Sequence, residues 1–253
     1  MLTLVEVQDF LQKAGRGEVD SSRLEPLIEK FGEECKDALR KQLTKRGDYR
    51  IRMSGLGRPL CQQQLEKQGM KQDVAYNDIM RFLMGDLVEA VAIFVLKATG
   101  VKIVDEQRQC TVDLAGQEVK GTLDVILDID GEEKVWDIKS ASPWSFSNKF
   151  SGRGGYDVIK EDDPFGYIMQ GHLYAKAEDK PFGGWIVIDK SSGEWDFVQA
   201  PEDQAEDSKT YIAEAESRVK SIVNDAPFKV PFQSVPETYT VKGNKIETGN
   251  RLM

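Results

Sequence analysis

Apolar residues recur every three or four positions in the N-terminal part of the chain, over residues 3–13 and again over residues 22–45. This period places them on one face of a helix, so both segments are predicted to be amphipathic α-helices. A third, short helix that is rich in glutamine is expected over residues 60–68. The three helices predict a small N-terminal helical lobe, residues 1–70, packed on a core of residues 71–253 within one structural unit.

The longest helical pattern runs from Tyr76 to Thr99 and is followed by Gly100, a residue type that commonly terminates helices. Its second half is apolar on nearly every side, which is typical of a buried helix. Glu89 lies inside this apolar run, and a buried carboxylate needs a partner or must stay protonated. Gly85, one turn earlier on the same face, leaves room for a ligand or another backbone. A basic partner or a surface position for Glu89 is the alternative.

Beyond the long helix the apolar period changes to two, which is the spacing of β-strands. Three consecutive strands are expected to form an antiparallel meander, and two later strands a hairpin. Two more helices are expected, the first opened by Pro164. Prolines and polar residues dominate from Asp225 onward, and the last residues are expected to be frayed. The chain is therefore predicted to be an α/β (α+β) protein with a mixed central β-sheet flanked by helices. The expected strands are 101–113, 117–130, 134–140, 184–189 and 194–198, and the two helices are 164–177 and 202–223.

The pair Asp130-Gly131 stands between two alternating stretches, which is a strong signal for a two-residue hairpin turn. If these residues form the turn, the strands pair so that Asp124 lies opposite Asp137. Like charges in directly opposed positions are destabilising, so a cation is expected there. Lys139 shares the face of Asp137 because side chains alternate along a strand. Two carboxylates and an ammonium fit a divalent cation beside an anionic reactant, whereas a solvated, exposed Asp/Lys face is the ordinary alternative.

The stretch after Ser140 is predicted to be a long irregular loop, and such loops are uncommon unless they are functional. Aromatic residues alternate there with cations, as a groove for single-stranded nucleic acid requires. An upstream glycine-rich turn that carries Arg58 is a candidate phosphate contact, since glycine permits close approach of the backbone. A mobile surface loop and a plain turn are the alternatives. The candidate DNA-binding residues of the loop are Trp144, Phe146, Lys149, Arg153 and Tyr156.

The formal net charge of -9 argues against a protein that coats nucleic acid non-specifically, although it leaves room for a local basic groove. Three widely spaced cysteines provide neither a disulfide framework nor a CxxC zinc site, so a cytoplasmic location is expected. The most apolar window, residues 88–96, is too short to span a membrane. His172 is the only histidine, so neither a catalytic triad nor a His-based metal site is expected.

Four short motifs follow one another along the chain: Gly85-x-x-x-Glu89, Gly121-x-x-Asp124, Asp137-Ile138-Lys139 and Gln170-x-x-x-Tyr174. In this order they resemble the PD-(D/E)xK nuclease superfamily, and in particular its RecB-type exonuclease branch. That branch includes phage recombination exonucleases and the mitochondrial genome-maintenance exonuclease. The resemblance covers roughly residues 54 to 190.

This resemblance implies a restriction-endonuclease-like core with the catalytic cluster at one edge of the sheet. Glu89, Asp124 and Asp137, with the backbone carbonyl of Ile138, would hold Mg²⁺ or Mn²⁺. Lys139 would position or activate the attacking water and offset charge at the phosphate. Gln170 and Tyr174 would contact the DNA backbone or orient the catalytic groups, with Ser140 as a further DNA contact.

The implied activity is that of a metal-dependent DNA exonuclease that hydrolyses phosphodiester bonds at single-stranded ends in recombination, repair or replication. A single-strand annealing protein or a helicase is an expected partner, in a bacterial or phage-infected host cell, and no membrane role is expected. A structure-specific or restriction-type endonuclease is the first alternative. A non-catalytic nucleic-acid-binding module is the second.

Two departures from the family pattern affect these expectations. Many members carry a histidine on the first core helix, where this chain has Glu89. Several relatives bind an iron–sulfur cluster through one cysteine before the core and three after it. This chain has Cys61 before the core but no cysteine after Cys110, so no iron–sulfur cluster is expected.

Overall fold

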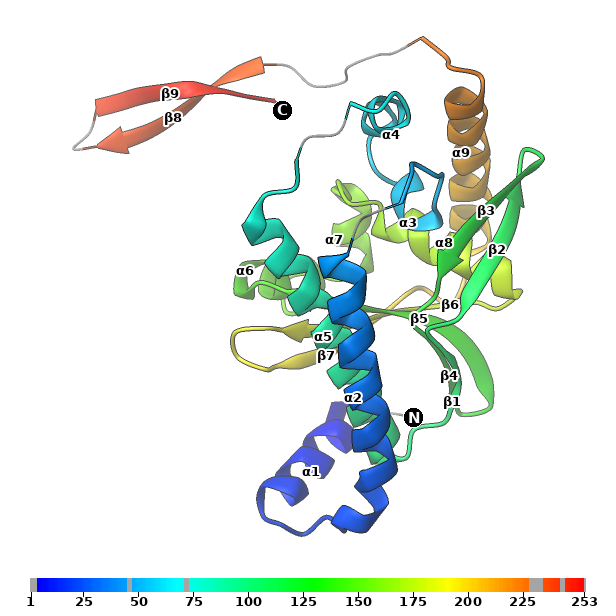
Figure 1. Cartoon of the computed structure of the whole chain (residues 1–253), viewed down its shortest axis with the longest axis vertical. Helices are drawn as coiled ribbons and strands as arrows, with labels where there is room; N and C mark the ends of the chain where they lie inside the picture. Colours follow the sequence, from blue (N-terminus) through cyan, green and yellow to red (C-terminus); the bar gives the residue numbers. More distant parts are fainter. Residues whose placement is uncertain (1–3, 45–46, 71–72, 228–233, 242–243, 253) are drawn as a thin grey trace.

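A five-stranded sheet forms the centre of the computed structural model, which describes residues 4–44, 47–70, 73–227, 234–241 and 244–252 (Figure 1). β5 and β6 run parallel, and every other neighbouring pair in this sheet is antiparallel. The mixed sheet flanked by helices that the sequence predicts is therefore confirmed. The order across the sheet is β1 (Ile103–Glu106), β4 (Val125–Ile129), β5 (Glu132–Ala141), β6 (Phe182–Asp189) and β7 (Trp195–Gln199).

The hairpin between β4 and β5 has the register that the sequence predicts. Asp130 and Gly131 have φ angles of 56° and 89°, as a type I′ turn requires. Pairing starts with Val125 opposite Trp136 and continues without a break to the turn. Asp124 lies one position before the first paired residue, so it belongs to the segment that leads into β4.

The first two strands expected from the sequence are each broken in the middle. β2 (Gln109–Leu114) and β3 (Gln117–Thr122) form a two-stranded sheet of their own, while β1 pairs with β4. The break falls at Gln107, which has a φ of 47° and whose N–H donates to the Asp124 carbonyl at 2.9 Å. The expectation of continuous strands is wrong. Apolar residues continue to alternate through the bend, so the pattern gives no sign that the strand is interrupted. The bend places Asp124 at a corner between the two sheets.

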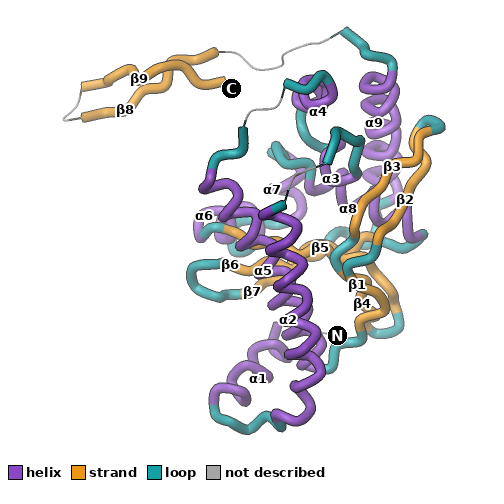
Figure 2. The backbone as a smooth tube through the Cα atoms, in the orientation of Figure 1, coloured by secondary structure: helices purple, strands orange, loops and turns teal. Residues whose placement is uncertain are grey.

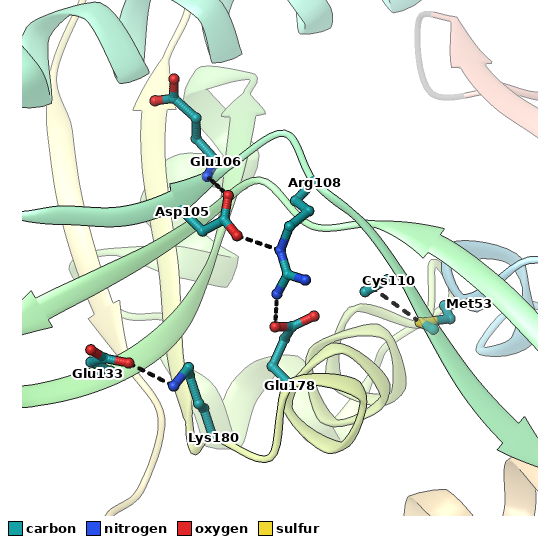
Figure 3. A network of polar contacts seen from close by, with 8 residues as sticks. All are labelled: Met53, Asp105, Glu106, Arg108, Cys110, Glu133, Glu178 and Lys180. Atoms are coloured by element: carbon teal, nitrogen blue, oxygen red, sulfur yellow. Dashed lines mark hydrogen bonds and ion pairs between the residues drawn. The ribbon is translucent and has the colours of Figure 1, made fainter.

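Two ion pairs fasten this region to a helix (Figure 3). The guanidinium of Arg108 pairs with Asp105 at the end of β1 and with Glu178 at the end of α8 (Tyr167–Glu178). Lys180, just after α8, pairs with Glu133 of β5 at 2.6 Å. The bend and α8 are therefore held in one arrangement.

One face of the sheet is covered by α5 (Tyr76–Thr99), with α2 (Ser21–Leu43) packed along it and α1 (Leu4–Gly15) beside it (Figures 1 and 2). α5 has the bounds that the sequence predicts, and Gly100 ends it in the left-handed conformation. Its buried side chains pack against apolar residues of β4 and β5. Val91 is 42% exposed, so the expectation that this half of the helix is buried on all sides is too strong.

The opposite face is covered by α8 and α9 (Ala205–Val223), with two short helices, α3 (Met53–Leu56) and α4 (Leu60–Lys67), packed against them. The helices formed by residues 4–70 thus lie on both sides of the sheet, α1 and α2 on one and α3 and α4 on the other. The expected boundary between residues 70 and 71 falls next to a residue that lies outside the described ones.

The helix expected from Pro164 begins three residues later, at Tyr167. The carboxylate of Asp163 accepts hydrogen bonds from the N–H groups of Tyr167 and Ile168, both at 2.9 Å. These two N–H groups are among those that a helix leaves unpaired at its start. Asp163 therefore sets the start of α8, and the proline precedes it.

Two segments that lack a long apolar period contain regular structure. The stretch after Ser140 forms α6 (Pro143–Ser145), a π-helical turn (Phe146–Phe150) and α7 (Tyr156–Glu161). Beyond Asp225, β8 (Ser234–Val241) pairs with β9 (Asn244–Leu252) as a hairpin that stands away from the rest of the chain in Figures 1 and 2. The expectation of an irregular loop after Ser140 is wrong, because this segment lacks the long apolar period by which helices and strands are recognised.

Candidate active site

Three acidic side chains approach one another from three separate elements. Glu89 projects from α5, Asp124 from the bend before β4, and Asp137 from the middle of β5. Lys139 lies two positions after Asp137 and on the same face of β5, and its Nζ is 2.5 Å from Asp137 Oδ2. The four residues that the sequence predicts to be catalytic are therefore neighbours.

Backbone and amide groups fix two of these carboxylates. Asp124 Oδ2 accepts the backbone N–H of Ile138 at 2.7 Å, so the side chain reaches across to the neighbouring strand. The side-chain amide of Gln107 donates to Glu89. The sequence does not predict this role of Gln107, because the role depends on the bend in which the residue lies.

Asp137 is the most enclosed member of the cluster, with 1% of its surface exposed. Gln170 Nε2 donates to Asp137 Oδ1 at 3.0 Å, and Lys139 contacts the other oxygen. Within the described part of the chain, that second oxygen, Oδ2, is buried without a hydrogen bond. Its contact with Lys139 is an ion pair.

Burial raises the pKa of all three carboxyl groups. At Asp124, repulsion from Glu89 and Asp137 adds to burial and holds the pKa well above its usual value. At Asp137 the Lys139 ammonium opposes the effect of burial. Burial by itself would lower the pKa of Lys139, but attraction from Asp137 and Asp124 outweighs it, so this pKa is raised. The cluster therefore has more negative charge than its lysine balances.

The carboxylates suit a divalent ion by their chemistry but not by their present arrangement. The residues that the structure describes include no group of three or more His, Cys, Asp or Glu side chains already arranged to hold a metal. Each carboxylate is engaged instead by a protein donor. The donor chemistry does fit Mg²⁺ or Mn²⁺, because all three ligands are carboxylate oxygens and Asp137 Oδ2 is left without a hydrogen bond.

Gln170 and Tyr174 lie underneath the cluster rather than on its surface. Tyr174 is buried, and its hydroxyl accepts a hydrogen bond from Gln170 Nε2 at 3.3 Å. A Cβ on Gly121 would lie 2.5 Å from the Tyr174 ring, which explains the glycine at this position. The prediction that these residues orient the catalytic groups agrees with these contacts, whereas direct contact of Tyr174 with DNA is wrong because the side chain is enclosed.

The candidate DNA-binding residues after β5 divide into two groups. Phe146 and Tyr156 are buried in the core beside β6, so their predicted stacking with bases is wrong. Trp144 is 66% exposed and Arg153 is exposed, so both can reach a ligand. Lys149 forms an ion pair with Asp162.

Three further residues complete the sequence predictions. Ser140 Oγ lies 3.8 Å from the position of a Cβ on Gly85, so the gap beside this glycine faces the end of β5. Arg58 is exposed, between α3 and α4. His172 is buried and hydrogen-bonded to Tyr156, in keeping with the structural role expected for it.

Tyr167 is a further residue of the site that the sequence does not predict. Lys139 Nζ lies 5.0 Å from the centre of its ring, a cation–π contact. Tyr167 is the first residue of α8, three positions before Gln170, so one helix supports both Lys139 and Asp137. No periodic or motif signal marks this tyrosine.

Comparisons with known proteins add little to this description. A scan against protein-family models finds no match, and a search of curated proteins finds none. Among solved structures, the chain is similar to "Crystal structure of SSO0001", with 18% sequence identity and a TM-score of 0.46. The match covers 76% of this chain and 85% of that one. No helix within the described ranges is long and apolar enough to cross a membrane.

Proposed function

We propose that this protein is a metal-dependent deoxyribonuclease of the PD-(D/E)xK type, which hydrolyses phosphodiester bonds at single-stranded DNA ends. The observation that carries the proposal is the cluster of Glu89, Asp124 and Asp137 around one lysine. Burying three like charges is costly unless cations balance them. A bound divalent ion would offset this cost and would explain why the fold brings the three carboxylates together.

The roles of the residues follow from their contacts. Glu89, Asp124, Asp137 and the carbonyl of Ile138 would hold Mg²⁺ or Mn²⁺, which when bound supplies an activated water and stabilises charge on the phosphate. Lys139, held by Asp137 and the Tyr167 ring, places a positive charge beside the scissile phosphate. Gln170 keeps the Asp137 carboxylate in one orientation.

The preference for single-stranded ends rests on exposed groups from the segment after β5 and from the turn before α4. Trp144 offers an aromatic face for a base, and Arg153 and Arg58 offer cations for phosphates. An exonuclease of this kind would act in recombination, repair or replication, alongside an annealing protein or a helicase. The free thiols of Cys35, Cys61 and Cys110 are in keeping with a reducing cytoplasm.

The test is cleavage of end-labelled linear single strands and of circular single strands of the same length with Mg²⁺. We expect linear strands to be degraded and circles to persist; equal cleavage of circles would favour an endonuclease. Asp137→Asn should lower the rate at least ~100-fold, because a lost metal ligand removes several kcal/mol of transition-state stabilisation.

The matched control is Glu118→Gln, which removes one negative charge from an exposed position on β3. This variant should cleave DNA at the wild-type rate. Retained DNA binding with loss of cleavage in Asp137→Asn would support catalysis at this cluster. A wild-type protein that binds DNA without cleaving it under any divalent ion would favour the non-catalytic module.

A further inference from the structure

An exposed aromatic ring lies next to the contacts of Lys139. Phe165 is 57% exposed, and its ring stacks on Tyr167 with a centroid separation of 5.4 Å and an interplanar angle of 22°. Tyr167 in turn contacts the Lys139 ammonium through its ring. The Phe165 ring therefore lies against the same ring that contacts Lys139.

The backbone around Phe165 is held in place on both sides. Gly166 packs directly on Gly57, and a Cβ on either glycine would lie 2.3 Å from the other's Cα. Gly166 also has a φ of 75°, which L side chains rarely adopt. The Asp163 carboxylate holds the start of α8 from the other side. The exposed ring is thus carried by a rigid segment, as a binding platform requires.

The contact between Gly57 and Gly166 also brings the cation of Arg58 to the segment that carries Phe165. Arg58 follows Gly57 directly and is exposed. Burial raises the pKa of Tyr167, and Arg58 is close enough to act against that rise, as Lys139 does. The nearest acidic side chain on this segment, Asp163, is occupied by two N–H groups. Its charge is therefore partly offset where a phosphate would approach.

We propose that Phe165 and Arg58 form a nucleotide subsite next to the catalytic cluster, with the ring stacked on one unpaired base and the guanidinium on a neighbouring phosphate. This inference rests on the proposed nuclease function and deepens it, because it assigns the preference for single strands to particular residues. A base within a duplex has both faces covered by its neighbours. Only a terminal or unpaired base can offer a face to the Phe165 ring.

The experiment compares binding of two fluorescent thymidine oligonucleotides by anisotropy, with Ca²⁺ in place of Mg²⁺. One carries all its bases, and the other has abasic nucleotides at both ends, so that the phosphates are the same. We expect the wild-type protein to bind the complete oligonucleotide roughly ten-fold more tightly, since stacking on an aromatic side chain has about this effect per base.

Phe165→Ala should lose most of the preference for the complete oligonucleotide, and Phe165→Trp should restore it. Tyr76→Ala is the matched control, because Tyr76 is also an exposed aromatic residue, 85% exposed, but stands at the far end of α5 from Glu89. Arg58→Ala should weaken binding of both oligonucleotides to the same extent and reduce the salt dependence by about one phosphate contact.

Each result has a definite meaning. A Phe165→Ala protein that keeps the wild-type preference for the complete oligonucleotide overturns the subsite, whether or not the protein cleaves DNA. A preference that depends on Phe165 in a protein without nuclease activity under Mg²⁺ supports the subsite and contradicts the proposed catalysis. A wild-type protein that binds neither oligonucleotide overturns both proposals.

Discussion

At the scale of single residues, Asp137 shows how the fold keeps a charge in its interior. Its two oxygens are served by different partners, Lys139 from the same strand and Gln170 from α8. Neither contact alone would offset the loss of hydration. Gln170 makes no ion pair itself, so its contribution to the site is to hold Asp137 in position.

Replacing Gln170 by alanine should therefore impair use of the metal more than folding. Partners that orient metal ligands typically affect metal affinity or activity by 10–100-fold. We expect the Mg²⁺ concentration for half-maximal cleavage by Gln170→Ala to rise by about that factor. Cleavage rates measured over a series of Mg²⁺ concentrations give this value directly.

Gln64→Ala provides the control for Gln170→Ala. Gln64 is also a buried glutamine, but its amide donates to the carbonyl of Ala226, away from the cluster. Its loss should lower the melting temperature and leave the Mg²⁺ dependence unchanged. The positioning role of Gln170 would be refuted if the two variants showed the same Mg²⁺ dependence.

At the scale of elements, α8 is the support of the site. Its first residue contacts Lys139, its second turn holds Asp137, and its last residue is paired with Arg108 at the bend that carries Asp124 (Figure 3). The start of this helix depends on Asp163, which accepts two of its free N–H groups. Stability of the helix and geometry of the site should therefore change together.

Asp163→Ala should lower the free energy of unfolding by about 1–2 kcal/mol, the usual effect of removing a helix cap. Asp163→Asn keeps one acceptor oxygen in place of two, so it should lose one of the two hydrogen bonds and the charge interaction with the helix start, and its stability should fall between those of the wild type and Asp163→Ala. Urea denaturation followed by circular dichroism measures both values. Equal losses in the two variants would show that charge, not capping, is what Asp163 contributes.

At the scale of the whole molecule, burial of the only histidine links stability to pH. Burial lowers the pKa of His172 to about 4, although Asp207 opposes this shift. Its ring is hydrogen-bonded to the Tyr156 hydroxyl at 3.0 Å and stacks on Tyr211. The folded core therefore favours the neutral form of the His172 ring.

The unfolded chain takes up a proton at His172 near pH 6.5, whereas the folded chain does so only near pH 4. Between these values the unfolded state binds more protons, so stability falls as the pH is lowered, by up to about 1.4 kcal/mol per pH unit. His172→Gln should be less stable at pH 7 but lose less stability on acidification. Urea midpoints at pH 7, 6 and 5 compare the two proteins, and parallel pH profiles would contradict the prediction.

Local signals in the sequence determined several parts of this protein. The Asp130-Gly131 turn set the register of β4 and β5, and Gly100 set the end of α5, because both depend on backbone angles that particular residues favour. The four residues of the candidate catalytic cluster could be listed for a similar reason. Alternation along β5 and the spacing of motifs already place them in order.

Only the tertiary structure decided which side chains reach a ligand. Phe146, Tyr156 and Trp144 are all aromatic residues of the segment after β5. Phe146 and Tyr156 are buried and Trp144 is exposed, because burial depends on what packs against each ring. The bend at Gln107 and the close contact of Gly166 with Gly57 likewise arise from contacts between segments far apart in the chain. Such contacts form when the chain folds, and no short stretch of sequence records them.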